Sequence, residues 1–226
     1  MGQKWKQLIK KLILYNPLRS WISSRRHDRK FIEWERNGRP VPPPHIVKQR
    51  TLRTFAKRFN LKIMVETGTF YGDMVEAMKE DFDRIYSIEL SKELYEKAKK
   101  RFEDEEKIQL IQGDSGIELG NLINRIDGPA LFWLDGHYSA GVTAKGSKYT
   151  PIYEELTHIF EGTDKRHVII IDDARCFGTD SAYPSIEELS NFIKSNLPDS
   201  DVTVEDDSIR IVPRSMSEKP RHRTAY

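Results

Sequence analysis

The chain has 226 residues, of which 38% are hydrophobic and 32% charged, and its formal net charge is +2. This length suits one sizeable core with an extension better than two full domains. No apolar run approaches the roughly 20 residues needed to span a bilayer, which excludes a transmembrane protein. The single cysteine, Cys176, excludes an internal disulfide. Because the start also lacks a signal-peptide pattern, we expect a cytoplasmic location.

The first 60 residues are strongly basic, with 16 Lys and Arg against 3 Asp and Glu, whereas the rest of the chain has 21 against 32. Between Trp5 and Ile13, apolar residues recur at helical spacing opposite a set of lysines, which predicts a basic amphipathic helix. This helix either packs on its own domain, pairs with a second subunit of a homo-oligomer, or lies on an anionic membrane at the inner face through residues 4–22. Nucleic acid is the weaker interpretation of the same basic charge.

Residues 36–45, RNGRPVPPPH, contain four prolines. Proline lacks an N–H donor and restricts its neighbours, so this segment is predicted to be a linker or an ordered lid, not a helix or a central strand. Residues 47–59 resume a helical period. The sequence therefore divides into a basic helical extension with its linker (1–60), a core domain (61–213) and a flexible basic tail (214–226).

From residue 61 onward, short apolar runs alternate with helical patterns, which predicts an α/β fold with a mostly parallel sheet. Residues 202–212, VTVEDDSIRIV, are typical of two short strands around an acidic turn, and predict an antiparallel hairpin that closes a seven-stranded sheet. The other strands are expected at 62–66, 84–89, 108–112, 130–135 and 167–172.

Polar residues follow the first three predicted strands, at the end of an open sheet where ligands bind. The first strand ends in a glutamate followed by TGTFYG, in which Gly68 permits a tight turn and Gly72 permits close packing of the next helix. The second strand ends in Glu89, a suitable acceptor for two ribose hydroxyls. The third is followed by Asp114 and Ser115, which suit an adenine edge. The candidate residues of this nucleoside-shaped site are Glu66, Thr67, Gly68, Gly72, Glu89, Asp114 and Ser115.

Three more acids follow strands four and five: Asp135 in FWLDGH, and Asp172 with Asp173 in IIIDDAR. Adjacent strands would bring these carboxylates together, and their repulsion requires a counterion. A hard divalent cation such as Mg²⁺, Mn²⁺ or Ca²⁺ suits oxygen ligands. His137 is a candidate base near neutral pH. The alternative is that one or two of these acids cap helices or pair with basic residues such as Arg175.

Between residue 61 and about residue 212, the chain resembles the class I S-adenosylmethionine-dependent methyltransferases. The motifs VETGTFYG, YSIEL, IQGDS and ALFWLDGH carry the resemblance. It implies a Rossmann-like methyltransferase fold that binds S-adenosylmethionine. In that fold Glu66 and Gly68 would lie at the methionine end of the cofactor, Glu89 at the ribose, Asp114 with Ser115 at the adenine, and Asp135 beside the methyl donor.

The second acidic set is similar to that of the metal-dependent O-methyltransferases of the catechol and macrolide-sugar types. The catechol type has Asp-Asn where this chain has Asp172-Asp173, so the match is closer to the sugar type. The resemblance implies metal-assisted methylation of a hydroxyl on a sugar, glycan or related polar acceptor. The predicted catalytic residues are Asp135 and His137, of which His137 is inferred from its position two residues after Asp135. The base of the catechol type is a lysine, at a place that Tyr138 holds here, which leaves the identity of the base open.

The sequence disfavours two other classes of enzyme. An enzyme that methylates nucleic-acid bases would carry Asn or Asp before Pro-Pro and an aromatic after strand four, where this chain has LDGHY. A dehydrogenase is disfavoured because Tyr95 and Lys99 follow the second strand and ETGTFYG is not G-x-G-x-x-G. An RNA or small-phenol methyltransferase, and a non-catalytic membrane-associated adapter, remain as alternatives.

Overall fold

A computed structural model describes residues 28–136 and 150–217. The chain divides into two compact units, Met1–Lys48 and Gln49–Tyr226. The boundary falls inside helix α3 (His45–Phe59), twelve residues before the boundary expected from the sequence. The amphipathic helix predicted near Trp5 lies outside the described residues, as does the tail beyond residue 217. In the described part of the chain, no helix has both the length and the apolar character that crossing a membrane requires.

In the smaller unit, a helix over residues 28–36 precedes the proline-rich segment. Trp34 Nε1 donates a hydrogen bond to the carbonyl of Pro40 at 2.8 Å, and the Arg39 guanidinium lies 5.5 Å from the centre of the Trp34 ring. Arg39 also pairs with Glu35 at 2.9 Å. The segment is therefore an ordered loop folded back on its helix, and α3 begins directly after it.

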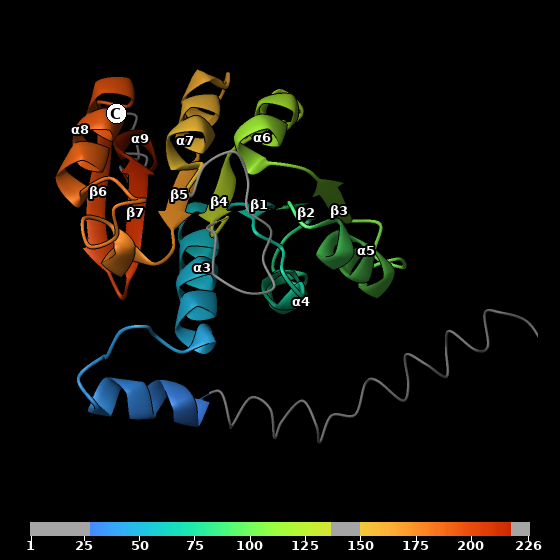
Figure 1. Cartoon of the computed structure of the whole chain (residues 1–226), viewed down its shortest axis with the longest axis horizontal. Helices are drawn as coiled ribbons and strands as arrows, with labels where there is room; N and C mark the ends of the chain where they lie inside the picture. The colour runs from blue at the N-terminus through green and yellow to red at the C-terminus, as the bar shows by residue number, and fades with distance from the viewer. Residues whose placement is uncertain (1–27, 137–149, 218–226) are drawn as a thin grey trace, which may run out of the picture. The chain divides into compact units, whose positions relative to one another are not determined.

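The larger unit is built on a seven-stranded sheet of order β3-β2-β1-β4-β5-β7-β6 (Figure 1). The first five of these neighbours pair in parallel, and β7 pairs antiparallel with both β5 and β6. This confirms the predicted mostly parallel sheet with a terminal hairpin, and each predicted strand lies within two residues of its observed bounds. The strands are β1 (Ile63–Thr67), β2 (Arg84–Glu89), β3 (Ile108–Gln112), β4 (Ala130–Leu134), β5 (Val168–Ile171), β6 (Ser200–Glu205) and β7 (Ser208–Pro213).

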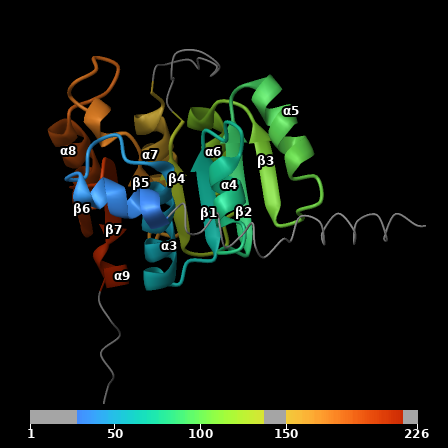
Figure 2. The ribbon, with the colours of Figure 1, turned by 90° about the horizontal axis from the view of Figure 1, so that it is seen from below.

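Helices cover both faces of this sheet (Figures 1 and 2). One face carries α4 (Asp73–Met78), α5 (Lys92–Arg101) and the part of α3 that belongs to this unit; the other carries α6 (Ser115–Ile123), α7 (Ile152–Glu161) and α8 (Ile186–Asn196). Two short helices complete the fold, the 3₁₀ turn η1 (Ala174–Cys176) and α9 (Arg214–Ser217). The first four residues of the expected flexible tail are thus helical.

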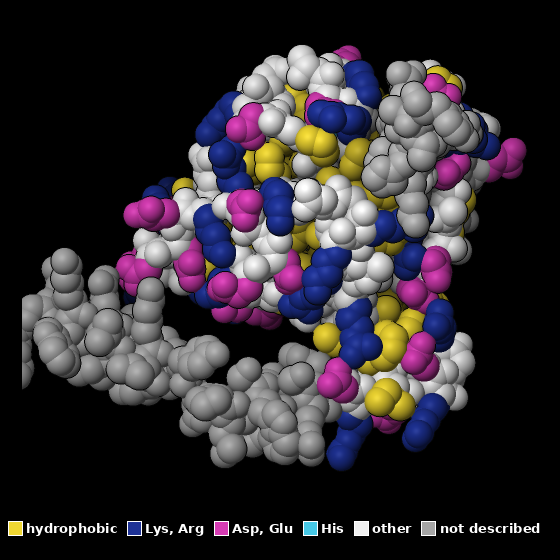
Figure 3. All heavy atoms as spheres, turned by 180° about the vertical axis from the view of Figure 1, so that it is seen from behind, with side chains coloured by type: hydrophobic (Ala, Val, Ile, Leu, Met, Phe, Trp, Pro, Cys, Tyr) yellow, Lys and Arg dark blue, Asp and Glu magenta, His cyan; other side chains and the backbone are white. Residues whose placement is uncertain are grey.

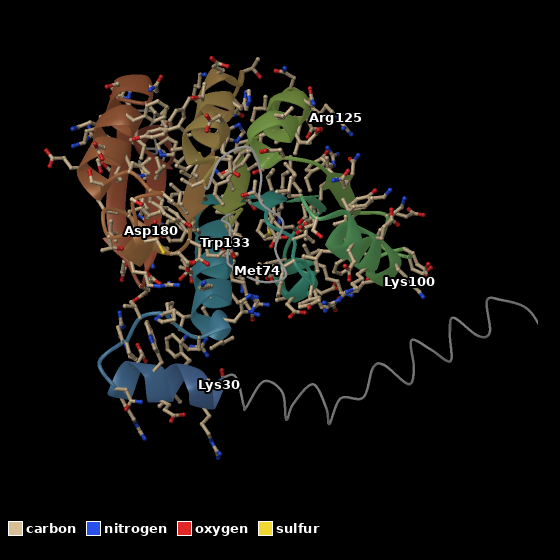
Figure 4. The ribbon with its side chains drawn as sticks, in the orientation of Figure 1. Lys30, Met74, Lys100, Arg125, Trp133 and Asp180 are labelled. Atoms are coloured by element: carbon tan, nitrogen blue, oxygen red, sulfur yellow. The ribbon has the colours of Figure 1, made fainter. Side chains whose placement is uncertain are left out.

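The two cores follow from the alternation of side chains along each strand. Val65 and Phe132, which are register partners, belong to the core under α6, α7 and α8. Met64 and Trp133 point to the opposite face, where Met74 of α4 packs in the same cluster (Figure 4). Because both faces are covered, the central strands β4 and β5 are apolar along their whole length and β1 is apolar up to Glu66, so polar residues appear where these strands end.

The face of the larger unit that Figure 3 shows carries both signs of charge in close mixture. Ion pairs such as Lys79–Glu105 at 2.9 Å and Arg101–Asp73 at 2.7 Å link neighbouring helices and loops. A protein that follows a polynucleotide backbone presents a continuous basic strip instead. The mixing seen here does not favour nucleic acid as a ligand of this face.

Gly72, which the sequence places in the cofactor site, is required by packing at the start of α4. Its φ is +78°, and an added Cβ would lie 2.6 Å from the Phe102 ring. Gly72→Ala should therefore lower the free energy of unfolding by about 1–3 kcal/mol. Gly128→Ala is the matched control, because an added Cβ there meets nothing within 4 Å. It should change stability by less than about 0.5 kcal/mol in urea unfolding; equal losses in both variants would contradict the packing argument.

Candidate cofactor and metal site

The parallel strands β3, β2, β1, β4 and β5 end side by side, so the residues that follow them share one edge of the sheet. Along this edge the acids occur in the order Asp114, Glu89, Glu66, Asp135 and Asp172. The register pairs Thr67 with both Ile88 and Leu134, which sets the end of β1 level with its two neighbours. The predicted gathering of acids at the carboxyl edge is therefore confirmed.

The turn between β1 and α4 is tightly constrained. Gly68 has a φ of +84° and Phe70 a φ of +50°, both in the left-handed region. The backbone N–H groups of Gly68 and Thr69 both donate to the carbonyl of Ile88, at 2.9 and 3.3 Å. A Cβ added to Gly68 would lie 2.4 Å from the backbone oxygen of Asp135. Only glycine fits here, and the turn after β1 lies directly against the turn after β4.

Glu89 closes this turn with its side chain. One carboxylate oxygen accepts the N–H of Phe70 at 2.7 Å, and the other accepts the N–H of Ser91 at 2.8 Å. Burial raises the pKa of Glu89, and these two N–H donors oppose the shift. Each carboxylate oxygen has a second lone pair, so both remain able to accept a ligand hydroxyl. Phe70 and Tyr71, each more than 40% exposed, add an aromatic surface beside the carboxylate.

Glu66 lies beneath the turn and is only 1% exposed. It accepts a hydrogen bond from Ser87 Oγ at 2.5 Å, and Ser87 Oγ lies 2.6 Å from Thr69 Oγ1. Burial raises the pKa of Glu66 to about 8, against the opposing effect of Ser87, and the charge of Glu89 adds to the increase. Burial thus favours the protonated, neutral form of Glu66, which lies under the turn and holds Ser87 by a hydrogen bond. Its contact with the methionine end of a cofactor stays a prediction.

Asp114 and Ser115 occupy the start of α6. Asp114 caps this helix, with Oδ1 accepting the N–H of Gly116 at 3.0 Å. Ser115 is buried, and its hydroxyl donates to Glu155 Oε1 of α7 at 2.6 Å. The hydroxyl of Ser115 thus points into the protein, and Asp114 is the side chain better placed to meet an adenine edge.

The three acids that follow β4 and β5 form a cluster. Asp135, Asp172 and Asp173 each offer a carboxylate oxygen, and these oxygens lie within 4.8 Å of one another. Two oxygens on opposite sides of one ion are about 4 Å apart for Mg²⁺ and about 5 Å apart for Ca²⁺, twice the metal–oxygen distance. The donor chemistry and the spacing of these side chains therefore fit one hard divalent cation.

Asp173 is also held by a basic residue. Its φ is +56°, and its Oδ1 accepts a hydrogen bond from Arg175 Nη1 at 2.8 Å. Arg175 forms an ion pair with Asp207, in the turn between β6 and β7, and its backbone N–H donates to Asp207 Oδ1 at 2.8 Å. Asp206 and Asp207 both have positive φ, as a two-residue hairpin turn of type I′ requires. The hairpin therefore fixes the position of one candidate metal ligand.

Tyr183 is a residue near this cluster that the sequence did not reveal. It packs edge-on against Phe177, with ring centres 5.2 Å apart. Burial raises the pKa of Tyr183, and the nearby Cys176 and Asp173 add to the increase. Its loop precedes α8, so only the fold brings it to the acids. His137, the predicted base, lies outside the described residues.

The chain matches no known family model, and no curated protein sequence matches it. Solved structures do match. The O-methyltransferase TomG of Streptomyces achromogenes, involved in tomaymycin synthesis and solved with S-adenosylmethionine, is 15% identical over 93% of this chain and 98% of its own, with a TM-score of 0.54. The Bacillus cereus O-methyltransferase, solved with S-adenosylhomocysteine, is 14% identical over 82% and 90%, also with a TM-score of 0.54.

A third match is the methyltransferase PaMTH1 of Podospora anserina, solved with S-adenosylhomocysteine. It is 16% identical over 88% of this chain and 96% of its own, with a TM-score of 0.54. At these identities the likeness is one of fold. The chain has the Rossmann-like fold of the class I S-adenosylmethionine-dependent methyltransferases, as the sequence motifs predicted.

The buried Glu66 should make stability depend on pH. In the unfolded chain the pKa of this carboxyl has its ordinary value of about 4.5, whereas in the folded protein the pKa is raised to about 8. The free energy of unfolding should therefore fall as pH rises through this window, by at most about 1.4 kcal/mol per pH unit for this carboxyl. Glu66→Gln keeps an acceptor for Ser87 and should reduce the loss, measured by urea unfolding at both ends of the window. Glu93→Gln, a change at an exposed position, should leave the pH dependence of stability as in the wild-type protein. If Glu66→Gln also left this pH dependence unchanged, the prediction would be wrong.

Proposed function

We propose that this protein is an S-adenosylmethionine-dependent O-methyltransferase, assisted by a divalent metal. The observation that carries the proposal is the ordered row of acids at the carboxyl edge, which ends in the cluster of Asp135, Asp172 and Asp173. The fold supports the cofactor class, because methyltransferases of this fold have been solved with S-adenosylmethionine or S-adenosylhomocysteine bound. The cluster supports a metal, because it contains oxygen ligands alone.

The cofactor would lie across the turns that follow β1, β2 and β3. Glu89 would accept hydrogen bonds from the two ribose hydroxyls through its remaining lone pairs, while its backbone contacts hold the turn in place. Asp114 would meet the adenine edge. Gly68 would allow the backbone to approach the methionine end, with Glu66 below it. The residues proposed to bind the cofactor are Glu66, Thr67, Gly68, Gly72, Glu89, Asp114 and Asp135. Ser115, whose hydroxyl donates to Glu155, would act on the cofactor site only through the start of α6.

The metal would be held by Asp135, Asp172 and Asp173. A divalent ion in this position supplies a template for two substrate hydroxyls and lowers the pKa of the one that attacks. The protein's own part is positioning, since Arg175 and the β6–β7 turn hold Asp173, and the carbonyl of Thr67 accepts the backbone N–H of Asp135 at 3.1 Å. His137, two residues after Asp135 in the sequence, is the proposed base for the released proton.

The proposed acceptor is a vicinal-hydroxyl compound, most specifically a sugar unit of a glycan or glycoconjugate. Support comes from the Asp172-Asp173 pair, which resembles the macrolide-sugar type more closely than the catechol type. Methyl transfer from labelled cofactor to glycans, phenols and RNA, with and without Mg²⁺, tests this choice.

Cofactor binding depends on Glu89 if the proposal is correct. Calorimetry should detect saturable binding of S-adenosylmethionine to the wild-type protein, and Glu89→Ala should weaken it by roughly 10–100-fold, since charge-assisted hydrogen bonds are worth about 1.5–3 kcal/mol. Glu93→Gln, which changes an exposed glutamate on the following helix, should bind like wild type. Absence of binding by the wild-type protein, or a preference for a dinucleotide, would refute the cofactor assignment.

If a metal assists the reaction, its removal should affect turnover and cofactor binding differently. Excess chelator should abolish methyl transfer and leave S-adenosylmethionine affinity nearly unchanged, and Asp172→Ala should do the same, because the ion acts on the acceptor hydroxyl. Asp83→Asn is the control, since Asp83 is exposed and precedes β2 at the opposite edge of the sheet. Full activity in excess chelator would eliminate the metal from the mechanism while leaving the cofactor assignment intact.

A further inference from the structure

Three buried polar side chains from different elements converge beside Gly136. Glu155, in the first turn of α7, is 1% exposed and accepts the hydrogen bond of Ser115 Oγ at 2.6 Å. A Cβ added to Gly136 would lie 3.1 Å from Glu155 Oε1, 3.1 Å from Thr67 Oγ1 and 3.2 Å from Ser115 Oγ. The Glu155 carboxyl therefore lies where the end of β1, the start of α6 and the backbone after β4 meet.

Each of these neighbours adjoins a part of the candidate site. Thr67 precedes the turn that contains Gly68, Ser115 follows Asp114, the cap of α6, and Gly136 follows Asp135 of the acidic cluster. Glu155 itself belongs to neither the row of acids at the strand ends nor the cluster. It lies on the face of the sheet that α6 and α7 cover, and from there it contacts Ser115 of the candidate site.

Packing alone does not explain an acid at this position. The other buried residues of α7 are Ile152, Leu156, Ile159 and Phe160, all apolar. Desolvation makes a buried carboxyl costly, and it raises the pKa of Glu155 to about 7 even though the Ser115 hydroxyl opposes the shift. An apolar side chain of similar size would fill the space at lower cost, so the carboxyl is explained by its specific contacts.

We propose that Glu155 is a positioning residue that holds the start of α6 and the backbone after Asp135 in the geometry required for ligand binding. The inference rests on the proposed function. Without the carboxyl, Ser115 would lose its acceptor, and the first turn of α6 with Asp114 would be free to shift. On the other side, the Gly136 backbone would lose a close neighbour, and Asp135 would move with it. One side chain thus affects both the cofactor site and the metal site.

The test measures two affinities separately on the full chain, for S-adenosylhomocysteine and for Mn²⁺ without cofactor. Glu155→Leu removes the acceptor at similar volume and should weaken both by about fivefold or more. Glu155→Gln keeps an acceptor oxygen and should restore both to within about twofold. Ser115→Ala should weaken S-adenosylhomocysteine alone. Glu161→Gln, at the exposed last residue of the same helix, should change neither.

The outcomes separate this inference from the function on which it rests. A wild-type protein that does not bind S-adenosylhomocysteine refutes the proposed function and the inference with it. A wild-type protein that binds both ligands, together with a folded Glu155→Leu variant of equal affinities, overturns the inference alone. If Glu155→Leu does not fold, Ser115→Ala decides: cofactor affinity equal to wild type overturns the proposal, and a selective loss supports it.

Discussion

Parallel pairing of five strands places several carboxyl groups at one edge of the sheet. Their mutual repulsion must be offset by burial, hydrogen bonds or positive charge, and this requirement determines the contacts of the surrounding residues. The described residues offset this charge in different ways. Glu66 and Glu155 are buried deeply enough to hold protons near neutral pH. Glu89 accepts two backbone N–H groups, and Asp173 pairs with Arg175. The positive charges of a sulfonium cofactor and a divalent ion would complement the acids that remain ionised.

The contacts that offset charge also fix the shape of the site. The N–H of Phe70 that satisfies Glu89 comes from a residue held at positive φ, so the acid and the turn stabilise each other. Asp207 accepts from both the side chain and the backbone N–H of Arg175, and its carbonyl accepts the N–H of Ala174. The turn after β1 and the turn between β6 and β7 are thus each held by several hydrogen bonds, so these described parts of the candidate site would need little ordering when a ligand binds.

The fold and the row of acids could be predicted from the sequence because both depend on local patterns. Short apolar runs marked the strands, and the polar residue after each run marked the edge where ligands bind. The contacts of Glu155 with Ser115 and of Arg175 with Asp207 could not be predicted, since 40 and 32 residues separate the partners. The same reason explains Tyr183. The deep burial of Glu66 could not be predicted from the sequence either, because a polar residue at the end of an apolar run can face either water or the protein interior.

Charge also bears on the order of events in the proposed reaction. Transfer of the methyl group converts the sulfonium of the cofactor into a neutral thioether, while the acceptor hydroxyl releases a proton. The ionised acids at this edge would attract the positively charged cofactor more strongly than the neutral product. The low solvent exposure of Glu89 and Asp172 would make this difference larger than in water. A divalent ion held by Asp135, Asp172 and Asp173 would keep its charge when the methyl group is transferred. The same edge that gathers the reactants would therefore release the spent cofactor and retain the metal.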